Sequence, residues 1–410
     1  MVLAVLFAGC GPRVVQPVAT PIPTSTPEAT PESTPVVETA VHSTTITFAA
    51  AGDTTLGSHF EEWFDEQVKS KVRTKDEQFR FAFDEVREYT AGADIAFLNH
   101  EGTLSDRGEA AIKQFTFRAR PEFVKVVVDG GIDVVALANN HAYDFGENAL
   151  VDTIVTLTSA GVLQCGAGYD GPETRTPAVL ERNGITVGFL GYSAIGKYDT
   201  KQKPTGMVYD TTRPGIAACI GDYPCLKAMV IEDVTKTAAT VDVPIVSFHW
   251  GVEGNHEPEA YQVELAHAAI DAGAKVVIGH HPHVLQGVEV YNGGVILYSL
   301  GNFIFGGNWS PKNKDSMIFR ATLSKNGVVS AAVVPIKHSN PPDAYFQPYL
   351  LEGEEATRLL TDLTVYSWKF PATLGFLAPY REAAAAQIAA AEAKKKAKEK
   401  PKPKGTKKPK

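Results

Sequence analysis

Short apolar runs and amphipathic segments alternate along most of the chain from residue 45 onward. The apolar runs are rich in β-branched residues, which is typical of buried strands. In the segments between them the apolar residues recur at helical spacing, and glycines follow several of these segments as C-terminal stops. This alternation predicts an α/β domain with parallel strands. Strands are predicted at 46–51, 94–98, 133–138, 185–190, 244–248 and 275–278, and helices at 81–91, 121–129, 147–159, 226–241 and 257–272.

Two later pairs of apolar runs have the pattern of β-hairpins. The first spans 287–304 and turns at Asn292-Gly293-Gly294, and the second spans 316–336 and turns at Lys325-Asn326-Gly327. Asparagine followed by glycine is a strong hairpin signal, because the tight turn needs residues that tolerate positive φ. We therefore expect mixed sheets, with an antiparallel part near the end of the domain.

The charge of the chain is distributed unevenly. Apolar residues make up 44% and charged residues 21% of the 410 residues, which is ordinary for a folded protein. The formal charge of −8 divides into +8 for residues 381–410 and −16 for the rest. Such an acidic body is a poor surface for nucleic acid, whose phosphates need a basic face, so no nucleic-acid partner is expected.

Composition divides the chain into five parts. Residues 46–345 are predicted to form the folded domain, with a C-terminal extension at 346–380 packed on it. Residues 381–410 are an Ala/Lys-rich basic tail, expected to be mostly disordered but with a helix candidate at 382–398. Residues 11–45 hold seven prolines and eight threonines, which favours an extended linker with a reach of about 100 Å.

The remaining part, residues 1–10, indicates where in the cell the protein is located. It ends in Leu6-Phe7-Ala8-Gly9-Cys10, which resembles the lipobox of bacterial lipoproteins, where the cysteine is lipidated. The basic region that usually precedes such a run is missing, so a hydrophobic stub clipped from a longer leader is the alternative. The two interpretations are compatible. We expect a truncated lipoprotein signal, and an extracytoplasmic protein anchored to the cell membrane at Cys10.

Three further cysteines lie beyond the linker. Cys219 and Cys225 flank Gly221, Asp222 and Pro224, which favour a turn. In an exported protein this spacing predicts a short disulfide loop, with two unpaired thiols as the alternative. Cys165 is expected to be a buried free thiol.

Polar residues of metal-ligand type follow five of the predicted strands. Because the carboxyl ends of strands in α/β sheets gather ligands, these clusters can converge on one crevice. Singly, each has a simpler explanation as a turn, a helix cap or a structural histidine. Carboxylate, amide oxygen and imidazole suit Mn, Fe or Zn, and two such ions can clamp the oxygens of a phosphoryl group. We expect one or two divalent ions. The clusters are Gly52-Asp53, Asn99-His100-Glu101, Asn139-Asn140-His141, His249-Trp250 and Gly279-His280-His281-Pro282-His283.

These motifs, in this order, resemble the CapA family, which is named for the synthesis of capsule and specifically of poly-γ-glutamate. Ser299-Leu300-Gly301-Asn302-Phe303 extends the resemblance, which covers roughly residues 45–340. CapA domains are in turn similar to the calcineurin-like metallophosphoesterases. The resemblance implies a four-layered α/β/β/α sandwich of metallophosphoesterase type, with mixed sheets and a metal site at the strand ends.

The resemblance also implies roles for individual residues. His141 stands where a general acid or phosphate contact is expected, and His281 remains an alternative to His280 because the final motif has one extra residue. The first metallophosphoesterase motif is Asp-x-His, whereas Thr54 and Thr55 follow the aspartate here, so one metal position lacks a usual ligand. Asp144 either orients His141 or caps the helix expected at 147–159. The metal-ligand positions are occupied by Asp53, Glu101, Asn140, His249, His280 and His283.

These features support three hypotheses on function. The first is a membrane-tethered CapA-type protein, acting with polymer-synthase partners in the membrane in the synthesis, export or anchoring of poly-γ-glutamate. The second is a general extracytoplasmic metal-dependent phosphoesterase whose substrate is a phosphoester. The third is a non-catalytic scaffold that binds the cell-surface polymer. Metal content separates the third hypothesis from the second.

Overall fold

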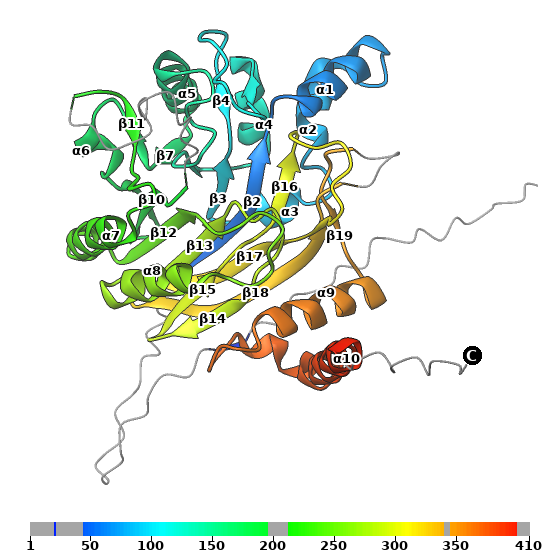
Figure 1. The fold of residues 1–410 in the computed structure, drawn as a ribbon. Helices are drawn as coiled ribbons and strands as arrows, with labels where there is room; N and C mark the ends of the chain where they lie inside the picture. The colour runs from blue at the N-terminus through cyan, green and yellow to red at the C-terminus, as the bar shows by residue number, and fades with distance from the viewer. Residues whose placement is uncertain (1–19, 22–43, 196–211, 340–344, 400–410) are drawn as a thin grey trace, which may run out of the picture.

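Two large mixed sheets lie face to face at the centre of the molecule, with helices on their outer sides (Figure 1). The computed structural model describes residues 20–21, 44–195, 212–339 and 345–399. Residues 1–10 with Cys10, and all of the linker 11–45 except its residues 20–21 and 44–45, lie outside the described residues. Among the helices of the described residues, none combines the length and apolar character needed to cross a bilayer.

The first sheet has nine strands, in the order β1-β18-β17-β2-β3-β6-β7, with β16 paired to β2 and β19 to β18. β2, β3, β6, β7 and β16 are parallel, whereas β17 and β18 form the antiparallel hairpin predicted at 316–336. The strands are β1 (Thr20–Pro21), β2 (Ile46–Thr55), β3 (Ile95–His100), β6 (Val134–Ala136), β7 (Leu163–Cys165), β16 (Asn302–Phe305), β17 (Asp315–Ser324), β18 (Gly327–Lys337) and β19 (Tyr349–Leu350).

The second sheet has six strands, in the order β14-β15-β13-β12-β10-β9. Its four central strands are parallel, and β14 and β9 are antiparallel edges. The predicted turn between β14 and β15 is confirmed: Asn292 and Gly293 both have positive φ, 45° and 78°, as a tight two-residue hairpin requires. The strands are β9 (Ala178–Arg182), β10 (Ile185–Ser193), β12 (Val243–His249), β13 (Val276–His280), β14 (Val288–Tyr291) and β15 (Gly294–Leu297).

The alternation of side chains along the strands explains the layers. Phe48 of β2 points between the sheets, where its ring lies 6.0 Å from that of Phe189 in β10. Ala49 and Ala51 of the same strand point the other way, into the core under the outer helices. The expected four-layered α/β/β/α sandwich with mixed sheets is therefore confirmed. The first sheet is covered by α1 (His59–Lys69), α2 (Lys75–Phe81), α3 (Arg87–Thr90), η1 (Pro121–Phe123), α4 (Val124–Asp129) and α5 (Glu147–Ser159), and the second by α7 (Tyr223–Ala238) and α8 (Ala260–Asp271).

The remaining elements complete the domain. α9 packs beside the sheets at the opposite end of the sandwich from α1 and β4, and Leu359 and Leu363 on it join the core between the sheets (Figure 1). The remaining elements are β4 (Thr103–Leu104), β5 (Arg118–Ala119), β8 (Ala167–Gly168), α6 (Gly171–Thr174), β11 (Gly215–Ile216), α9 (Gly353–Tyr366), η2 (Gly375–Tyr380) and α10 (Arg381–Glu399).

One predicted helix differs from the structure, and another is present as predicted. The single helix predicted at 81–91 is instead α2, which ends at Phe81, and the one-turn α3. Phe81, Phe83 and Val86 are all buried, and a straight helix through them would not point all three inward. The helix candidate at 382–398 is present as α10, which spans Arg381–Glu399 and buries Ala384, and residues 400–410 of the tail lie outside the described residues. Alanine, lysine and glutamate are strong helix formers, which explains why this segment is helical.

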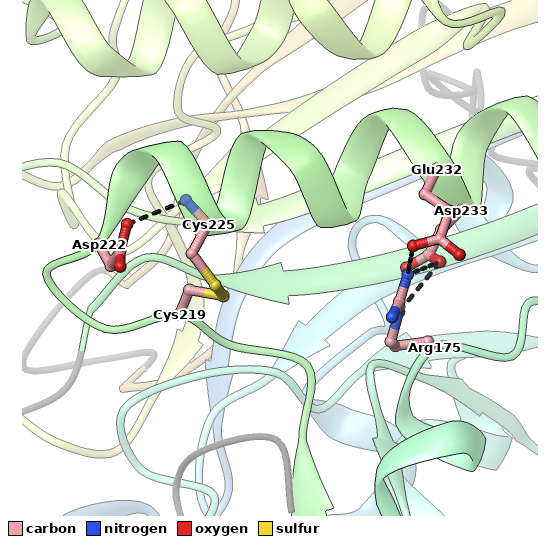
Figure 2. The surroundings of a disulfide bond; sticks show 6 residues. All are labelled: Arg175, Cys219, Asp222, Cys225, Glu232 and Asp233. Carbon is pink, nitrogen blue, oxygen red and sulfur yellow. Dashed lines mark hydrogen bonds and ion pairs between the residues drawn. A yellow bond between two sulfur atoms is a disulfide. The ribbon is translucent and has the colours of Figure 1, made fainter.

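The cysteines 219 and 225 form a disulfide at the start of α7, with their Cα atoms 5.9 Å apart (Figure 2). Asp222 lies between them and accepts a hydrogen bond of 2.9 Å from the backbone N–H of Cys225, so it caps the helix. Cys165 is the free cysteine of the described residues, and burial raises the pKa of its thiol to about 12.

Candidate metal centre

The predicted ligand clusters meet at one end of the sandwich, and they come from both sheets. Asp53 lies near the end of β2, Glu101 directly follows β3, and Asn140 belongs to the loop after β6. From the second sheet, His249 is the last residue of β12. His280 is the last residue of β13, and residues 281–283 come directly after it. Parallel strands bring their carboxyl ends to the same edge, which is why clusters far apart in sequence converge here.

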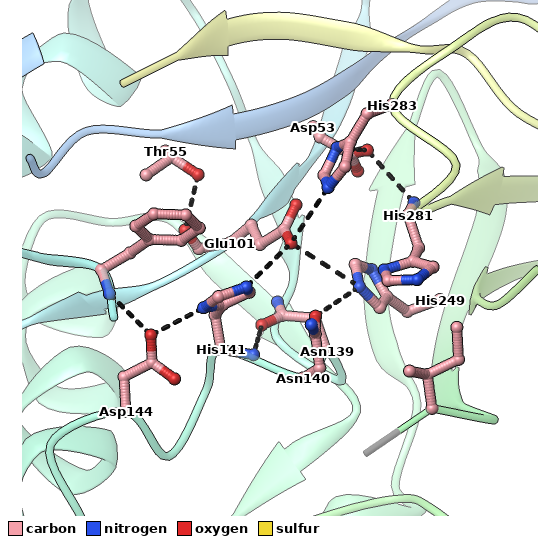
Figure 3. A network of polar contacts seen from close by, with 12 residues as sticks. Asp53, Thr55, Glu101, Asn139, Asn140, His141, Asp144, His249, His281 and His283 are labelled. Atoms are coloured by element: carbon pink, nitrogen blue, oxygen red, sulfur yellow. Dashed lines mark hydrogen bonds and ion pairs between the residues drawn. The ribbon is translucent and has the colours of Figure 1, made fainter. Parts of the chain in front are cut away.

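Glu101 lies at the centre of the cluster. The Nε2 atoms of His141 and His249 each lie 3.7 Å from its Oε1, and Nε2 of His283 lies 3.9 Å away (Figure 3). Glu101 is fully buried, and within the described residues neither of its carboxylate oxygens has a hydrogen-bond partner. An unpartnered buried carboxylate is costly, and a bound cation removes that cost.

Asp53 is the second buried carboxylate. Its Oδ1 accepts a hydrogen bond of 2.9 Å from the side chain of Asn99, and its Oδ2 accepts one of 3.1 Å from the backbone N–H of His281. The Nδ1 atoms of His280 and His283 lie 3.3 and 3.2 Å from its two oxygens. Burial opposes ionisation, but these two histidines outweigh it and hold the pKa of Asp53 well below its usual value.

Two overlapping groups of donors have the spacing of metal ligands. Glu101, His281 and His283 form one, and Asp53, Glu101 and His249 form the other, with the donor atoms of each group within 4.8 Å of one another. Oδ1 of Asn140 lies 2.7 Å from Nε2 of His249, so the amide also faces this position. Carboxylate, imidazole and amide donors suit a divalent transition-metal ion. The positive charge of such an ion would be placed beside the unpartnered oxygens of Glu101, where it is needed to balance the buried carboxylate.

The structure brings His281 rather than His280 into these groups. The ring of His280 is fully buried and lies 6.1 Å from that of Phe97, on the side of the inner core. The backbone at His281 has a φ of 91°, which turns the chain abruptly after β13. That turn directs the second histidine of the motif, not the first, toward Glu101. His280 contacts Asp53 but belongs to neither donor group, whereas the sequence favoured His280 over His281; which of the two binds the metal stays a prediction.

The protonation of the cluster fits the same interpretation. Burial raises the pKa of Glu101 to about 8, with the charge of Asp53 adding to the rise and that of His283 opposing it. Burial also opposes the charged form of His283, but Glu101 and Asp53 raise its pKa to about 9. Burial and the neighbouring His281 hold the pKa of His249 well below its usual value. Glu101 and His283 thus retain protons where a divalent cation would place its positive charge, whereas His249 and Asp53 do not.

His141 and Asp144 form a buried pair beside the donor groups. Nδ1 of His141 lies 2.7 Å from Oδ2 of Asp144, which also accepts a hydrogen bond of 2.6 Å from the backbone N–H of Phe117. The ring of Phe117 stacks on His141 with centroids 4.1 Å apart. Asp144 therefore orients His141, and Gly146 occupies the N-cap position of α5 instead. Burial lowers the pKa of His141, while Asp144 opposes that shift.

The two threonines that replace the expected Asp-x-His motif hold the backbone of Glu101. The hydroxyl of Thr55 donates a hydrogen bond of 2.9 Å to the Glu101 carbonyl, and the carbonyl of Thr54 accepts one of 2.8 Å from the Glu101 N–H. The hydroxyl of Thr54 lies 3.5 Å from the carbonyl of Gly52, so both threonine hydroxyls face backbone carbonyls. The position of the usual histidine therefore offers a structural contact and no metal ligand.

Three further residues contact the cluster, and of these sequence reasoning missed Lys113. Lys113 pairs with Asp144 and donates a hydrogen bond of 2.9 Å to the carbonyl of Asn140. Asn99 binds Asp53, and Oδ1 of Asn302 lies 2.9 Å from Nδ1 of His283. Asn99 and Asn302 stand inside motifs that were recognised, so their positions were available. Lys113 lies in an irregular loop, and no spacing pointed to it.

The fold and these contacts define a layered α/β protein with a candidate divalent-metal site at the ends of two facing sheets. A family model described as "Bacterial capsule synthesis protein PGA_cap" matches residues 47–307. The match covers more than half of the chain, and the chain belongs to this family of bacterial capsule synthesis proteins.

Named relatives agree with this assignment. The chain is 31% identical to the PGA biosynthesis protein CapA of Bacillus subtilis (strain 168), over 78% of this chain and 78% of that protein. It is 32% identical to the capsule biosynthesis protein CapA of Bacillus anthracis, over 71% of this chain and 67% of that protein. Among solved structures, a 5′-nucleotidase of Candida albicans matches 71% of this chain and 52% of its own, with 12% identity and a TM-score of 0.38. A likeness of that size carries no argument about function.

Proposed function

We propose that this protein acts in the synthesis or export of a poly-γ-glutamate capsule or a related cell-surface polymer, as a metal-dependent hydrolase of phosphoesterase type. The observation that carries the proposal is the buried Glu101, whose unpartnered oxygens face three histidines within a chain of the capsule synthesis family. The substrate is a bond of the polymer or a phosphoester formed during its assembly.

The residues fit one or two divalent ions. Glu101 is shared by both donor groups, so it would bridge two positions; the other ligands would be Asp53, Asn140, His249, His281 and His283. A bound Mn, Fe or Zn ion would supply Lewis-acid polarisation of the phosphoryl or acyl oxygen. The threonines after Asp53 leave one position with fewer ligands, which favours weaker binding there.

His141 is suited to move a proton. With its Nδ1 toward Asp144, its Nε2 faces Glu101 and the space where a substrate oxygen would approach. Asp144 and Phe117 hold the ring in this orientation from one side, and Lys113 pairs with Asp144 there, so the imidazole needs no reorganisation when the proton transfers. We assign it the protonation of the leaving group by the Nε2 proton of its imidazolium form, a form that Asp144 stabilises.

The protein is proposed to work outside the cytoplasm, held to the cell membrane by a lipid on Cys10. The disulfide between Cys219 and Cys225 supports this location, because such bonds persist in oxidising compartments. The Pro/Thr-rich linker would hold the domain away from the membrane, near membrane-bound polymer synthases as partners and the growing polymer as ligand.

The test combines metal analysis with hydrolysis. Purified protein is loaded with Mn²⁺, Fe²⁺ or Zn²⁺ and assayed on a chromogenic phosphodiester and on poly-γ-glutamate. His141→Ala should keep its metal but lose about 10²–10⁴-fold in rate, because general acid catalysis contributes that much. Cleavage of phosphodiesters alone would favour a general phosphoesterase. If the metal-loaded protein hydrolyses neither substrate and a His141→Ala strain still produces full capsule, the protein is a non-catalytic scaffold rather than an enzyme.

A further inference from the structure

Two fully buried glutamines connect the loops that surround the candidate metal centre. Gln262 lies in the first turn of α8, and Gln286 lies three residues after His283. Both side chains are 0% exposed, and Nε2 of Gln262 donates a hydrogen bond of 3.0 Å to Oε1 of Gln286.

The remaining polar atoms of the pair bind the loop that follows His249. Nε2 of Gln286 donates a hydrogen bond of 2.8 Å to the carbonyl of Asn255, and Oε1 of Gln262 accepts one of 2.8 Å from the N–H of Glu259. The Gln262 amide also packs on Gly251, where a Cβ would come within 2.9 Å of it. The pair therefore ties the segment after β12 to the segment after β13.

The segment after β13 needs such support. His281 and His283 have φ values of 91° and 57°, a region that residues with a Cβ seldom adopt. Strained backbone of this kind persists only where the surroundings hold it in place. The N–H of Gly254 donates a hydrogen bond of 2.8 Å to the carbonyl of Pro282, so the same loop that Gln286 binds also holds the chain between the two histidines.

We propose that Gln262 and Gln286 are positioning residues, which hold His281 and His283 in the geometry that binds the metal. This inference rests on the proposed metal centre. Both amides use a donor and an acceptor, so a change on either side leaves buried polar groups without a partner and frees the loop to relax. Partners that orient metal ligands typically change metal affinity by about 10–100-fold when they are replaced.

The experiment uses the full chain and Zn²⁺ alone as the probe. Gln286→Met and Gln262→Met are close in size to glutamine and remove the hydrogen bonds, while Gln286→Glu keeps the acceptor for Gln262. Gln347→Met is the matched control, because Gln347 is a buried glutamine that donates to the carbonyl of Phe81 under the outer helices. Zn²⁺ affinity is measured by calorimetry, Co²⁺ binding by its visible spectrum, and the backbone of 281–286 by amide hydrogen exchange.

We expect Gln286→Met and Gln262→Met to bind Zn²⁺ about 10–100-fold more weakly, with a changed Co²⁺ spectrum and faster exchange at 281–286. Gln286→Glu should recover part of the affinity, and Gln347→Met should bind as wild type does. Wild-type affinity in folded Gln286→Met or Gln262→Met overturns the inference, as does an equal loss in the control. If the wild type binds no metal, the proposed function fails. Amide hydrogen exchange at 281–286 then tests the positioning role by itself, and unchanged exchange in Gln286→Met and Gln262→Met overturns that role.

Discussion

Replacing Asp53 by asparagine would test how strongly the cluster depends on one buried charge. The substitution keeps the size of the side chain but exchanges one carboxylate oxygen for an NH₂ group. Both oxygens of Asp53 accept hydrogen bonds, from Asn99 on one side and from the N–H of His281 on the other. Whichever side the new NH₂ group takes, it meets another donor, so one hydrogen bond is lost in either orientation.

The magnitude can be worked out from these contacts. A hydrogen bond to a charged group contributes about 1.5–3 kcal/mol, and breaking a buried ion pair costs about 3–5 kcal/mol. The two costs overlap, because the same carboxylate also faces His280 and His283. We expect Asp53→Asn to lower the free energy of unfolding of the metal-free protein by roughly 3 kcal/mol. Loss of a charged ligand should weaken metal binding by more than about 100-fold.

Urea unfolding of chelator-treated protein measures the first effect, and calorimetric titration with Mn²⁺ or Zn²⁺ the second. Asp94→Asn is the matched control. Asp94 lies at the other end of the same pair of strands, where its Oδ2 accepts two hydrogen bonds from Thr47, 2.7 and 2.8 Å long. An asparagine there can still accept both through its carbonyl oxygen, so metal affinity should not change. Wild-type metal affinity in Asp53→Asn would refute the assignment of Asp53 as a ligand.

Three further predictions concern pH, the disulfide and the last helix. The pKa values of Glu101 and His283 in the metal-free fold, about 8 and about 9, exceed their ordinary 4.5 and 6.5, so these two groups take up protons on folding. Below about pH 6.5 the opposite effect of the buried His100, His141, His249 and His338, whose pKa values are lowered, works against this, so stability should fall from about pH 7 to 9. Urea unfolding at several pH values measures the profile, and a flat profile between about pH 7 and 9 contradicts this. Replacing Cys219 and Cys225 by serine should cost about 2 kcal/mol by the chain-entropy estimate for so short a loop, measured by thermal unfolding, whereas complete unfolding would contradict that estimate. Removing residues 381–410 should lower the free energy of unfolding by about 1–2 kcal/mol, since the buried Ala384 and half-buried Ile388 are the main apolar contacts of this segment. The truncated protein should also bind polyanions more weakly at low salt, and a large fall in its melting temperature would assign the tail a larger role.

The strands and the place of the site could be predicted because both depend on local patterns. Buried parallel strands read as apolar runs, and the residues directly after them fall at one edge whatever the loops do. The helix 147–159 was predicted with the bounds that α5 has, since its apolar stripe is uninterrupted. Asp53, Glu101 and His249 were placed correctly at the strand ends for the same reason.

The loops after the strands were harder to predict, because loop backbone sets where a side chain points. The positive φ at His281 reverses which histidine of the pair faces Glu101, and no propensity of histidine indicates such a conformation. The break between α2 and α3 is likewise a tertiary effect, in which burial of Phe83 and Val86 overrides helical spacing. Lys113 reaches Asp144 from 31 residues upstream in sequence, a pairing that only the folded loop reveals.

The division of the metal-donor residues between the two sheets affects how the protein unfolds. Asp53 and Glu101 belong to one sheet, and His249, His281 and His283 to the other, so any ion held among them is a cross-link between the halves of the sandwich. Sliding of one sheet over the other would break that link before it disturbed the hydrogen bonds within either sheet. Metal loading should therefore slow global opening more than local fraying, and the metal-free protein should be cleaved faster by proteases.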